Sequence, residues 1–181
     1  MKPTIKPIFI HIPKTAGVSI QSITMGHSRC LHRKASKYSK SDRQNAFVFS
    51  FARNPYDRLV SSFFYLRQGG MNEKDKAYGE SLPNNFKKFV NLDFDLNWIH
   101  FRPMMSWLDR KIDFIGRFEN LQEDFNIVCD KIGIPQQQIP HNNKSKHKHY
   151  SEYYDDETRQ IVAEKYAEDI EYFGYKFESL K

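Results

Sequence analysis

An apolar run that enters a turn of small and cationic residues is the feature that most constrains this chain. Ile8 to Ile12 forms the run, and the segment Lys14-Thr15-Ala16-Gly17-Val18-Ser19 follows it after one proline. This pattern predicts a buried strand, a tight loop and a helix, with small residues that let backbone N–H groups approach an anion. Lys14 adds a positive charge there, and Thr15 and Ser19 carry hydroxyls. The segment therefore predicts a site for a phosphate-bearing ligand.

The turn differs from a Walker A loop. No Gly-Lys-Ser/Thr closes it, and Pro13 stands where that loop would begin. The same residues also fit an ordinary strand-turn-helix unit of an α/β protein, which needs no ligand. On this segment alone, both interpretations stay open.

A second strand-helix unit strengthens the phosphate hypothesis. Ala46 to Ala52 is apolar enough for a buried strand, and Asn54 with Pro55 is typical of the start of a helix. Arg53 would then lie at the carboxyl end of a strand, where open α/β sheets bind ligands, and Ser61 about two turns into the helix. A guanidinium and a hydroxyl in these places could hold a second phosphate.

Arg53 also has a simpler interpretation. It could form an ion pair with Asp57, and Ser61 could be a small packing residue. Without the first loop, this second unit would favour that interpretation.

Together the two segments resemble the carbohydrate sulfotransferases that use 3'-phosphoadenylyl sulfate, in particular the relatives of the heparan-sulfate enzymes. In that family a PKTAGTS-like loop holds the 5'-phosphosulfate, and an RNPYDRLVS-like segment holds the 3'-phosphate. The resemblance continues through residues 114–121, 143–145 and 166–175, so it spans nearly the whole chain. One departure is Val18, where the family often has Thr, so a hydroxyl contact to the cofactor is missing.

The resemblance implies an α/β, P-loop-like three-layer fold with a central, mainly parallel sheet flanked by helices. It also implies that the donor is 3'-phosphoadenylyl sulfate, that the product is 3'-phosphoadenosine 5'-phosphate, and that no metal is required. The implied cofactor-binding residues are Lys14, Thr15, Ala16, Gly17, Val18, Ser19, Arg53, Ser61, Lys144 and Ser145.

Length and charge agree with one catalytic domain over residues 1–181, because a chain of this size buries a substantial core but is short for two domains. A formal charge of +6 favours anionic ligands. No nucleic-acid motif or regular basic stripe singles out DNA or RNA, so we expect no nucleic-acid partner. No stretch is long and apolar enough to span a bilayer, and we expect a soluble, cytoplasmic protein.

Sulfuryl transfer gives each of these residue types a task. An acceptor hydroxyl attacks sulfur in line while the bridging oxygen of the nucleotide leaves, so positioning and charge stabilisation dominate. We assign Lys14 to the leaving oxygen and the transferred group. Backbone N–H groups around Thr15 to Ser19 would hold the 5'-phosphate.

The acceptor hydroxyl also needs a general base, and histidine has a suitable pKa. His32 stands in a segment that resembles the family segment with a catalytic histidine, and we rank it first. His11, beside the cofactor loop, ranks second, although a strand histidine is often a hydrogen-bonded core residue. His100 ranks third.

The leading hypothesis is therefore a sulfotransferase that acts on a hydroxyl acceptor, with a carbohydrate as the expected substrate. An atypical P-loop kinase is one alternative, although its acidic magnesium ligands are not evident. A noncatalytic basic module that binds sulfated glycans or nucleic acid is the other. That module would leave the ordered pair of Lys14 and Arg53 unexplained. The sequence does not indicate an oligomeric state.

Periodicity and turn residues predict the remaining elements. We expect strands over 7–12, 46–52 and 112–117, helices over 18–25, 84–92, 96–109 and 121–132, a helix after residue 54 that stops at Gly69-Gly70, an exposed loop over 71–82, and a last helix from Asp155 to Gly174.

Overall fold

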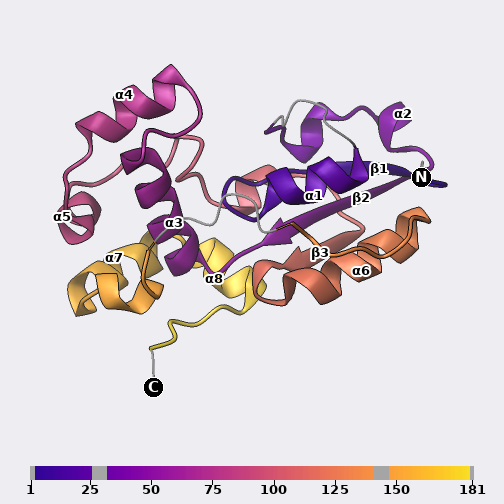
Figure 1. The fold of residues 1–181 in the computed structure, drawn as a ribbon. Coiled ribbons are helices and arrows are strands. Elements are labelled where there is room, and N and C mark those ends of the chain that lie inside the picture. The colour runs from indigo at the N-terminus through magenta and orange to yellow at the C-terminus, as the bar shows by residue number, and fades with distance from the viewer. Residues whose placement is uncertain (1–2, 26–31, 141–146, 180–181) are drawn as a thin grey trace. The chain divides into compact units, whose positions relative to one another are not determined.

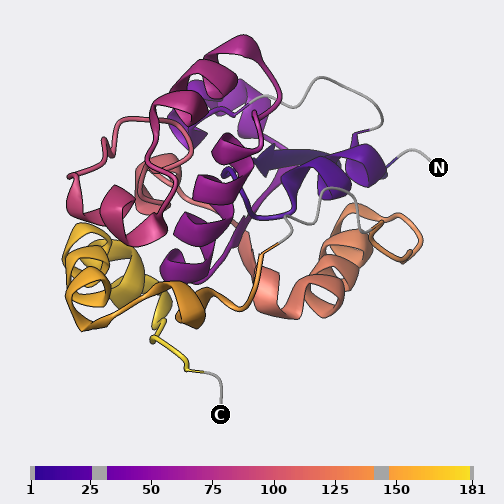
Figure 2. The same cartoon turned by 60° about the vertical axis from the view of Figure 1, so that its left-hand side comes forward.

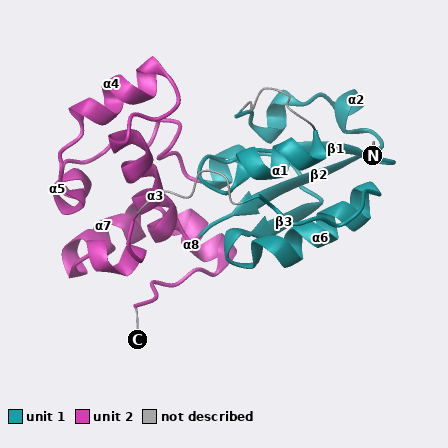
Figure 3. Ribbon diagram, viewed as in Figure 1, with its two compact units in different colours: residues 1–53, 104–143 teal, residues 54–103, 144–181 magenta. Residues whose placement is uncertain are grey.

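The computed structural model describes residues 3–25, 32–140 and 147–179. The chain divides into two compact units, which Figure 3 distinguishes by colour. Unit 1 comprises residues 1–53 and 104–143, and unit 2 comprises residues 54–103 and 144–181. Each unit therefore contains two separate stretches of the chain.

Unit 1 is built on a three-stranded parallel sheet in the order β1-β2-β3 (Figure 1). The strands are β1 (Lys6–Ile10), β2 (Ala46–Ala52) and β3 (Phe114–Arg117). In the sheet, Ile8 lies opposite Val48, and Ser50 lies opposite Ile115. Parallel neighbours need crossover connections, and helices supply them here. The predicted parallel sheet is confirmed, with the first and third strands one or two residues shorter than expected.

Helices flank this sheet, as predicted. The two longest in unit 1 are α1 (Gly17–Thr24) and α6 (Leu121–Ile132), and the shorter ones are η1 (Ala35–Lys37), α2 (Lys40–Arg43), η2 (Met105–Trp107) and η3 (Phe118–Asn120). Strand and helix side chains share one apolar core whose buried members are Phe9, Ile20, Phe49, Phe51, Phe125, Val128, Cys129, Ile132, Ile134 and Ile139. The apolar stripe predicted for the 121–132 helix is therefore the face that it buries.

Unit 2 is helical. Its elements are α3 (Pro55–Arg67), α4 (Glu73–Ser81), α5 (Phe86–Asn91), η4 (Tyr150–Tyr153), α7 (Asp156–Lys165) and α8 (Ala167–Phe173). Figure 2 shows α4, α5 and α7 around α3. The core here is rich in aromatic rings, such as Phe63, Phe89 and Phe101, which pack 5.0–5.1 Å apart between centroids.

Helix α3 begins and ends as the sequence predicts. The Asn54 side chain accepts a hydrogen bond from the backbone N–H of Tyr56, and Pro55 takes the first helical position. At the other end, Gly69 and Gly70 adopt positive φ angles of 94° and 59°, which only glycine adopts without strain. This stop fixes the turn into α4.

The predicted exposed loop over 71–82 is wrong, because α4 occupies most of it. Few apolar residues mark this helix, and polar contacts hold it instead. The Asn72 side chain accepts from the N–H of Asp75, and the buried Asp75 carboxylate accepts hydrogen bonds from Asn72 and from the Tyr65 hydroxyl. A hydrophobic period does not detect a helix of this kind.

The predicted helix over 96–109 is also wrong. Only the short η2 forms there, and Pro103 removes a donor that a helix interior would need. The last helix is divided into α7 and α8 at Tyr166, whose φ of −116° and ψ of 26° are not helical. Tyr166 is buried, and its hydroxyl donates to the Phe101 carbonyl. This tertiary contact explains the break.

No helix within the described ranges is long and apolar enough to cross a membrane.

Candidate active site

The loop between β1 and α1 is strained at two residues that carry a Cβ. Lys14 has φ 71° and Ala16 has φ 63°, both in the left-handed region. Asn45 and Asp93 also have positive φ, but their residue types tolerate it. Non-glycine strain of this kind persists where surrounding contacts enforce it, and it is frequent at functional sites. The alternation around Lys14 and Ala16 turns successive N–H groups toward one side of the loop, as in anion-binding nests.

Helix α1 starts at this loop with no side-chain cap and no acidic residue in its first turn. Its first intrahelical bond joins the N–H of Ile20 to the Ala16 carbonyl, so the N–H groups of Gly17 to Ser19 precede the helical ladder. An open helix N-terminus attracts an anion through these donors and the helix dipole. The geometry suits the phosphate site that the sequence predicts.

The two hydroxyls of the loop are used locally. Thr15 Oγ1 donates to the Ile12 carbonyl at 2.9 Å, and Ser19 Oγ donates to the Pro140 carbonyl at 2.8 Å. Both residues are buried, whereas Val18 is 38% exposed. The hydroxyls therefore stabilise the loop and α1, and backbone N–H groups remain the donors best suited to a ligand.

Gly17 lies directly against the imidazole ring of His11. A Cβ at residue 17 would lie 1.9 Å from both Cδ2 and Nε2 of that ring, which is far inside van der Waals contact. Any side chain at residue 17 would clash with this ring, so only glycine fits there. The side chain of His11 is 4% exposed and also stacks on Phe9, with centroids 5.4 Å apart.

His32 lies beside His11, so the first two candidate bases form one cluster. Their ring centroids are 4.2 Å apart, and Nδ1 of His32 lies 3.0 Å from the His11 carbonyl oxygen. If Nδ1 carries the proton and donates to this carbonyl, Nε2 of the neutral ring is the basic nitrogen. The buried Trp107 packs edge-on to His32 at 6.1 Å. The sequence gives no signal that Trp107 packs against His32.

Arg53 holds the strained loop from the end of β2. Its Nη1 donates to the Lys14 carbonyl at 3.0 Å, and the guanidinium lies 4.0 Å from the centre of the Phe118 ring. Arg53 is only 7% exposed. The backbone of Lys14 is thus fixed by a group that the sequence assigns to a different phosphate. Phe118, which sequence reasoning also missed, follows β3 at the same edge of the sheet, because Ala52 pairs with Arg117.

Ser61 and His100 belong to unit 2. Ser61 is buried in α3. His100 is buried too, and its Nε2 lies 3.2 Å from Oδ1 of Asp75. Burial raises the pKa of Asp75, but hydrogen bonds from His100 and Tyr65 and the charge of His100 outweigh it, so the pKa is lowered. The third candidate base thus forms part of a buried polar network.

Arg58 is a second buried arginine that the sequence did not single out. Its Nη1 and Nη2 donate to the carbonyls of His100 and Arg102, and its side chain lies near the Tyr166 ring. This guanidinium joins α3 to the irregular segment that follows α5. Its contacts within unit 2 give it a structural role.

Two predicted cofactor residues, Lys144 and Ser145, lie outside the described residues. Within the described ranges, no three His, Cys, Asp or Glu side chains gather as a metal site would require.

Comparison with known proteins identifies relatives over most of the chain. The sulfotransferase family matches residues 1–176. An uncharacterized protein of Archaeoglobus fulgidus is 33% identical over 93 residues, which cover 50% of this chain and 70% of that protein. Human carbohydrate sulfotransferase 9 is 27% identical over 145 residues, which cover 66% of this chain and 32% of the human protein. The chain therefore spans about a third of that human relative. No solved structure matches it.

Proposed function

The chain belongs to the sulfotransferase family, whose donor is 3'-phosphoadenylyl sulfate, and from that premise we propose that it transfers the sulfuryl group to a hydroxyl of a carbohydrate. The observation that carries this proposal is the strained loop at Lys14, which opens onto the uncapped N-terminus of α1. That arrangement offers backbone donors and one amine to a single anionic group. We also propose that residues 1–181 act as one sulfotransferase domain, because the family match includes segments of both units.

The 5'-phosphosulfate would bind at the start of α1. Backbone N–H groups of residues 15–19 hold the phosphate, and the dipole of α1 favours its charge. The Thr15 and Ser19 hydroxyls act indirectly, because their hydrogen bonds to Ile12 and Pro140 keep the loop in shape. Gly17 allows the backbone to approach the ligand and the His11 ring at once.

The 3'-phosphate would bind Arg53 and Ser61. Arg53 is always charged, and the planar fork of a guanidinium group suits the oxygens of a phosphate. The family resemblance is what supports Ser61 in this role. It supports Lys144 and Ser145 as well, which lie outside the described residues.

Lys14 would act on the transferred group. As the acceptor oxygen bonds to sulfur, the bond from sulfur to the bridging oxygen breaks and negative charge grows on that oxygen. An ammonium group placed there stabilises the transition state more than the ground state. The hydrogen bond from Arg53 to the Lys14 carbonyl holds the backbone from which this side chain extends.

His32 would take the proton of the acceptor hydroxyl through Nε2. The hydrogen bond between Nδ1 and the His11 carbonyl supports that tautomer, and Trp107 limits rotation of the ring. His11 would then be a positioning residue, since its carbonyl orients His32 and its ring packs on Gly17. His11 as the base itself stays the rival assignment.

A carbohydrate acceptor is supported by the name of the human relative, carbohydrate sulfotransferase 9. Calorimetric titration separates this proposal from a kinase and from a noncatalytic module. We expect 3'-phosphoadenosine 5'-phosphate to bind, and we expect no heat of binding from ATP with magnesium. Labelled sulfate should then pass from the donor to a glycan. If heparin or DNA binds and 3'-phosphoadenosine 5'-phosphate does not, the proposed enzymatic activity is refuted.

A further inference from the structure

A segment near the end of the chain returns to the start of helix α3 within unit 2. It comprises residues 174–178, and we call it the C-terminal strap. Nδ2 of the Asn54 side chain donates to the Lys176 carbonyl at 2.9 Å, across 122 positions of the sequence. The strap is therefore bound to the residue that caps α3.

Asn54 links the strap to α3 because both ends of its side-chain amide are used. Its Oδ1 accepts from the N–H of Tyr56 at 3.1 Å and so caps the helix. Its Nδ2 is the donor to the Lys176 carbonyl. Asn54 is only 5% exposed, so losing either partner would leave a buried polar group unsatisfied. The bond to the strap thus holds the amide in the orientation that caps α3.

Phe177 anchors the strap in a cage of three tyrosine rings. Its ring packs edge-on against Tyr56, Tyr150 and Tyr154, with centroids 5.1, 5.4 and 5.4 Å apart. The guanidinium of Arg159 lies 5.5 Å from the centre of the same ring. Edge-to-face pairs are favourable because the positive edge of one ring meets the negative face of the other. One phenylalanine therefore contacts the first turn of α3, η4 and α7.

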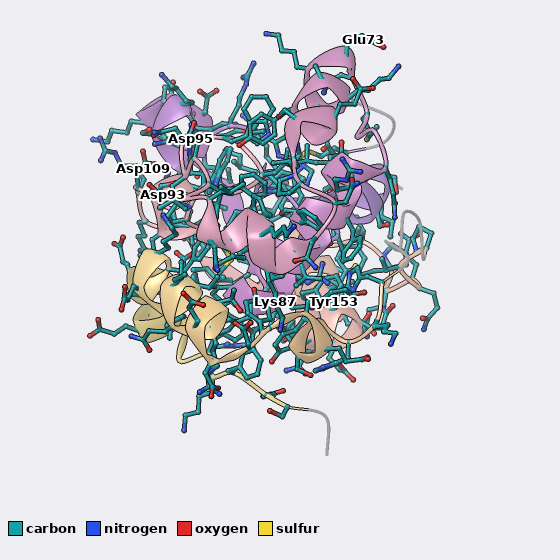
Figure 4. All side chains as sticks on the ribbon, turned by 90° about the vertical axis from the view of Figure 1, so that its left-hand side faces the viewer. Glu73, Lys87, Asp93, Asp95, Asp109 and Tyr153 are labelled. Atoms are coloured by element: carbon teal, nitrogen blue, oxygen red, sulfur yellow. The ribbon has the colours of Figure 1, made fainter. Side chains whose placement is uncertain are left out.

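The strap also holds η4. The N–H of Glu178 donates to the hydroxyl of Tyr150, the first residue of η4, at 2.7 Å. Figure 4 labels Tyr153, the last residue of this element. Just beyond it, the Tyr154 hydroxyl donates to the Tyr56 carbonyl at 3.0 Å. The strap, η4 and the first turn of α3 are therefore one connected cluster of unit 2.

Helix α3 carries one of the residues proposed to bind the 3'-phosphate. Ser61 lies about two turns into the helix and is 1% exposed. The other residue, Arg53, directly precedes Asn54 in the chain. Because a helix behaves as a rigid element, the placement of its first turn sets the placement of the Ser61 hydroxyl. The family match ends at residue 176, so Phe177 lies beyond it.

We propose that the C-terminal strap positions the residues that bind the 3'-phosphate. Phe177 holds Asn54 and the first turn of α3, and that turn places Ser61. The inference rests on the proposed function, which assigns Ser61 to this phosphate. Phe177 has no assigned contact with the nucleotide and acts only through α3. Hydrogen bonds weaken steeply when their geometry changes, so loss of the strap should weaken the hold on the 3'-phosphate and spare the 5'-phosphate.

Phe177→Ala tests this proposal through the preference for a 3'-phosphate. Calorimetry gives the affinities for 3'-phosphoadenosine 5'-phosphate and for adenosine 5'-phosphate, at a temperature where circular dichroism shows every variant to be folded. We expect Phe177→Ala to lose about tenfold in affinity for the first nucleotide and less than about threefold for the second. Phe177→Leu keeps an apolar side chain of similar size, so it should recover most of the loss.

Asn54→Ser tests the link between the strap and α3. Serine still caps a helix, but it has no amide to donate to the Lys176 carbonyl. This neutral change adds no charge that could repel a phosphate. We expect it to lower the preference for the 3'-phosphorylated nucleotide in the same direction as Phe177→Ala.

Two control variants separate positioning from a general loss of stability. Tyr172→Ala removes a ring that is 59% exposed and precedes the strap in the chain. Asp75→Asn disturbs the buried polar network of α4, which is also in unit 2. Both should keep the ratio of the two affinities within about twofold of the native ratio, as expected of independent sites.

The possible failures are distinguishable. If the native protein prefers the 3'-phosphorylated nucleotide and Phe177→Ala keeps that preference, the strap has no positioning role and the proposed function stands. The same holds if either control changes the ratio as much as Phe177→Ala does. If the native protein binds both nucleotides equally, the assignment of Arg53 and Ser61 to the 3'-phosphate is wrong, and this inference fails with it.

Discussion

Nδ1 of His32 lies 3.0 Å from the main-chain carbonyl oxygen of His11, and the two rings lie 4.2 Å apart between centroids. The two histidines that compete as the general base are thus neighbours, and one is oriented by the backbone of the other. Replacing either histidine therefore alters the surroundings of the other, so the two have to be compared through matched variants.

His32→Ala should lower the transfer rate by roughly two to four orders of magnitude, the usual contribution of a general base. Affinity for 3'-phosphoadenosine 5'-phosphate should change little, since His32 is assigned to the acceptor. Turnover and calorimetry on the same preparation check this. His11→Phe is the matched variant, because it keeps the stacking and the carbonyl but has no ring nitrogen. If His11→Phe is inactive and His32→Ala is not, His11 is the base.

Lys14→Ala should reduce the rate constant of transfer by about two to three orders of magnitude, as loss of a charge-stabilising group does elsewhere. The effect on nucleotide affinity should be smaller, because the charge that Lys14 meets grows during the reaction. Single-turnover measurements with labelled donor check the rate. Near-normal turnover in a folded Lys14→Ala protein would remove this residue from the mechanism.

Arg53→Ala should weaken 3'-phosphoadenosine 5'-phosphate far more than adenosine 5'-phosphate, which lacks the 3'-phosphate. Adenosine 5'-phosphate should also lose some affinity, because Arg53 supports the Lys14 carbonyl. Calorimetry with both nucleotides gives the ratio. An equal loss for both would mean that Arg53 only supports the loop.

Phe118→Ala tests the same arginine without removing its charge. The ring lies 4.0 Å from the guanidinium, and such a contact contributes about 0.5–1 kcal/mol or more when it is shielded from water. We expect affinity for 3'-phosphoadenosine 5'-phosphate to fall a few-fold, and Phe118→Tyr to retain it. Unchanged affinity in Phe118→Ala would show that the ring does not position Arg53.

Gly17→Ala should displace the His11 ring, because the added Cβ would lie 1.9 Å from two ring atoms. Overpacking of this kind costs about 1–3 kcal/mol, so the melting temperature should fall. Activity should fall with it, since His32 depends on His11. Val18→Ala is the control for the melting temperature, because residue 18 is the next in α1 and its side chain is exposed. If Gly17→Ala melts at the same temperature as Val18→Ala, the contact does not constrain the loop.

Asp75→Asn should destabilise the protein near pH 7 by about 1–3 kcal/mol, because it removes a buried charge that accepts several hydrogen bonds. The pKa of Asp75 is lowered in the folded protein, so its stabilisation is present above the unfolded pKa, near 4. It is lost as the pH falls through the lower folded value. Unfolding by urea at pH 7 and pH 3 should show the gap between the two proteins narrowing in acid. A constant gap would argue against an ionised Asp75.

The sequence predicts the sheet and the start of α3 well, because those parts depend on local chemistry. Apolar runs mark the strands, and Asn54 with Pro55 marks the helix start. The helix α4 was missed because the contacts of Asp75 to Tyr65 and His100 come from other segments. The break at Tyr166 was missed for the same reason.

The candidate site shows a similar division. The motifs point to Lys14 and Arg53, but the sequence does not indicate that Arg53 binds the Lys14 carbonyl or stacks on Phe118. It also presents His11 and His32 as rivals, although the fold makes them neighbours. Relations among distant residues depend on tertiary structure, which a local pattern does not contain.

Because the backbone is left-handed at Lys14 and Ala16, selection for stability and selection for activity should favour different residues in this loop. A residue with a Cβ costs about 1 kcal/mol or more in that region, so glycine would relieve strain at either position. A selection for heat resistance would therefore accept glycine at both. A selection for turnover would accept it at residue 16 but keep lysine at residue 14, because only the amine performs the proposed chemistry. Variants that emerge from the two selections should differ first at this residue.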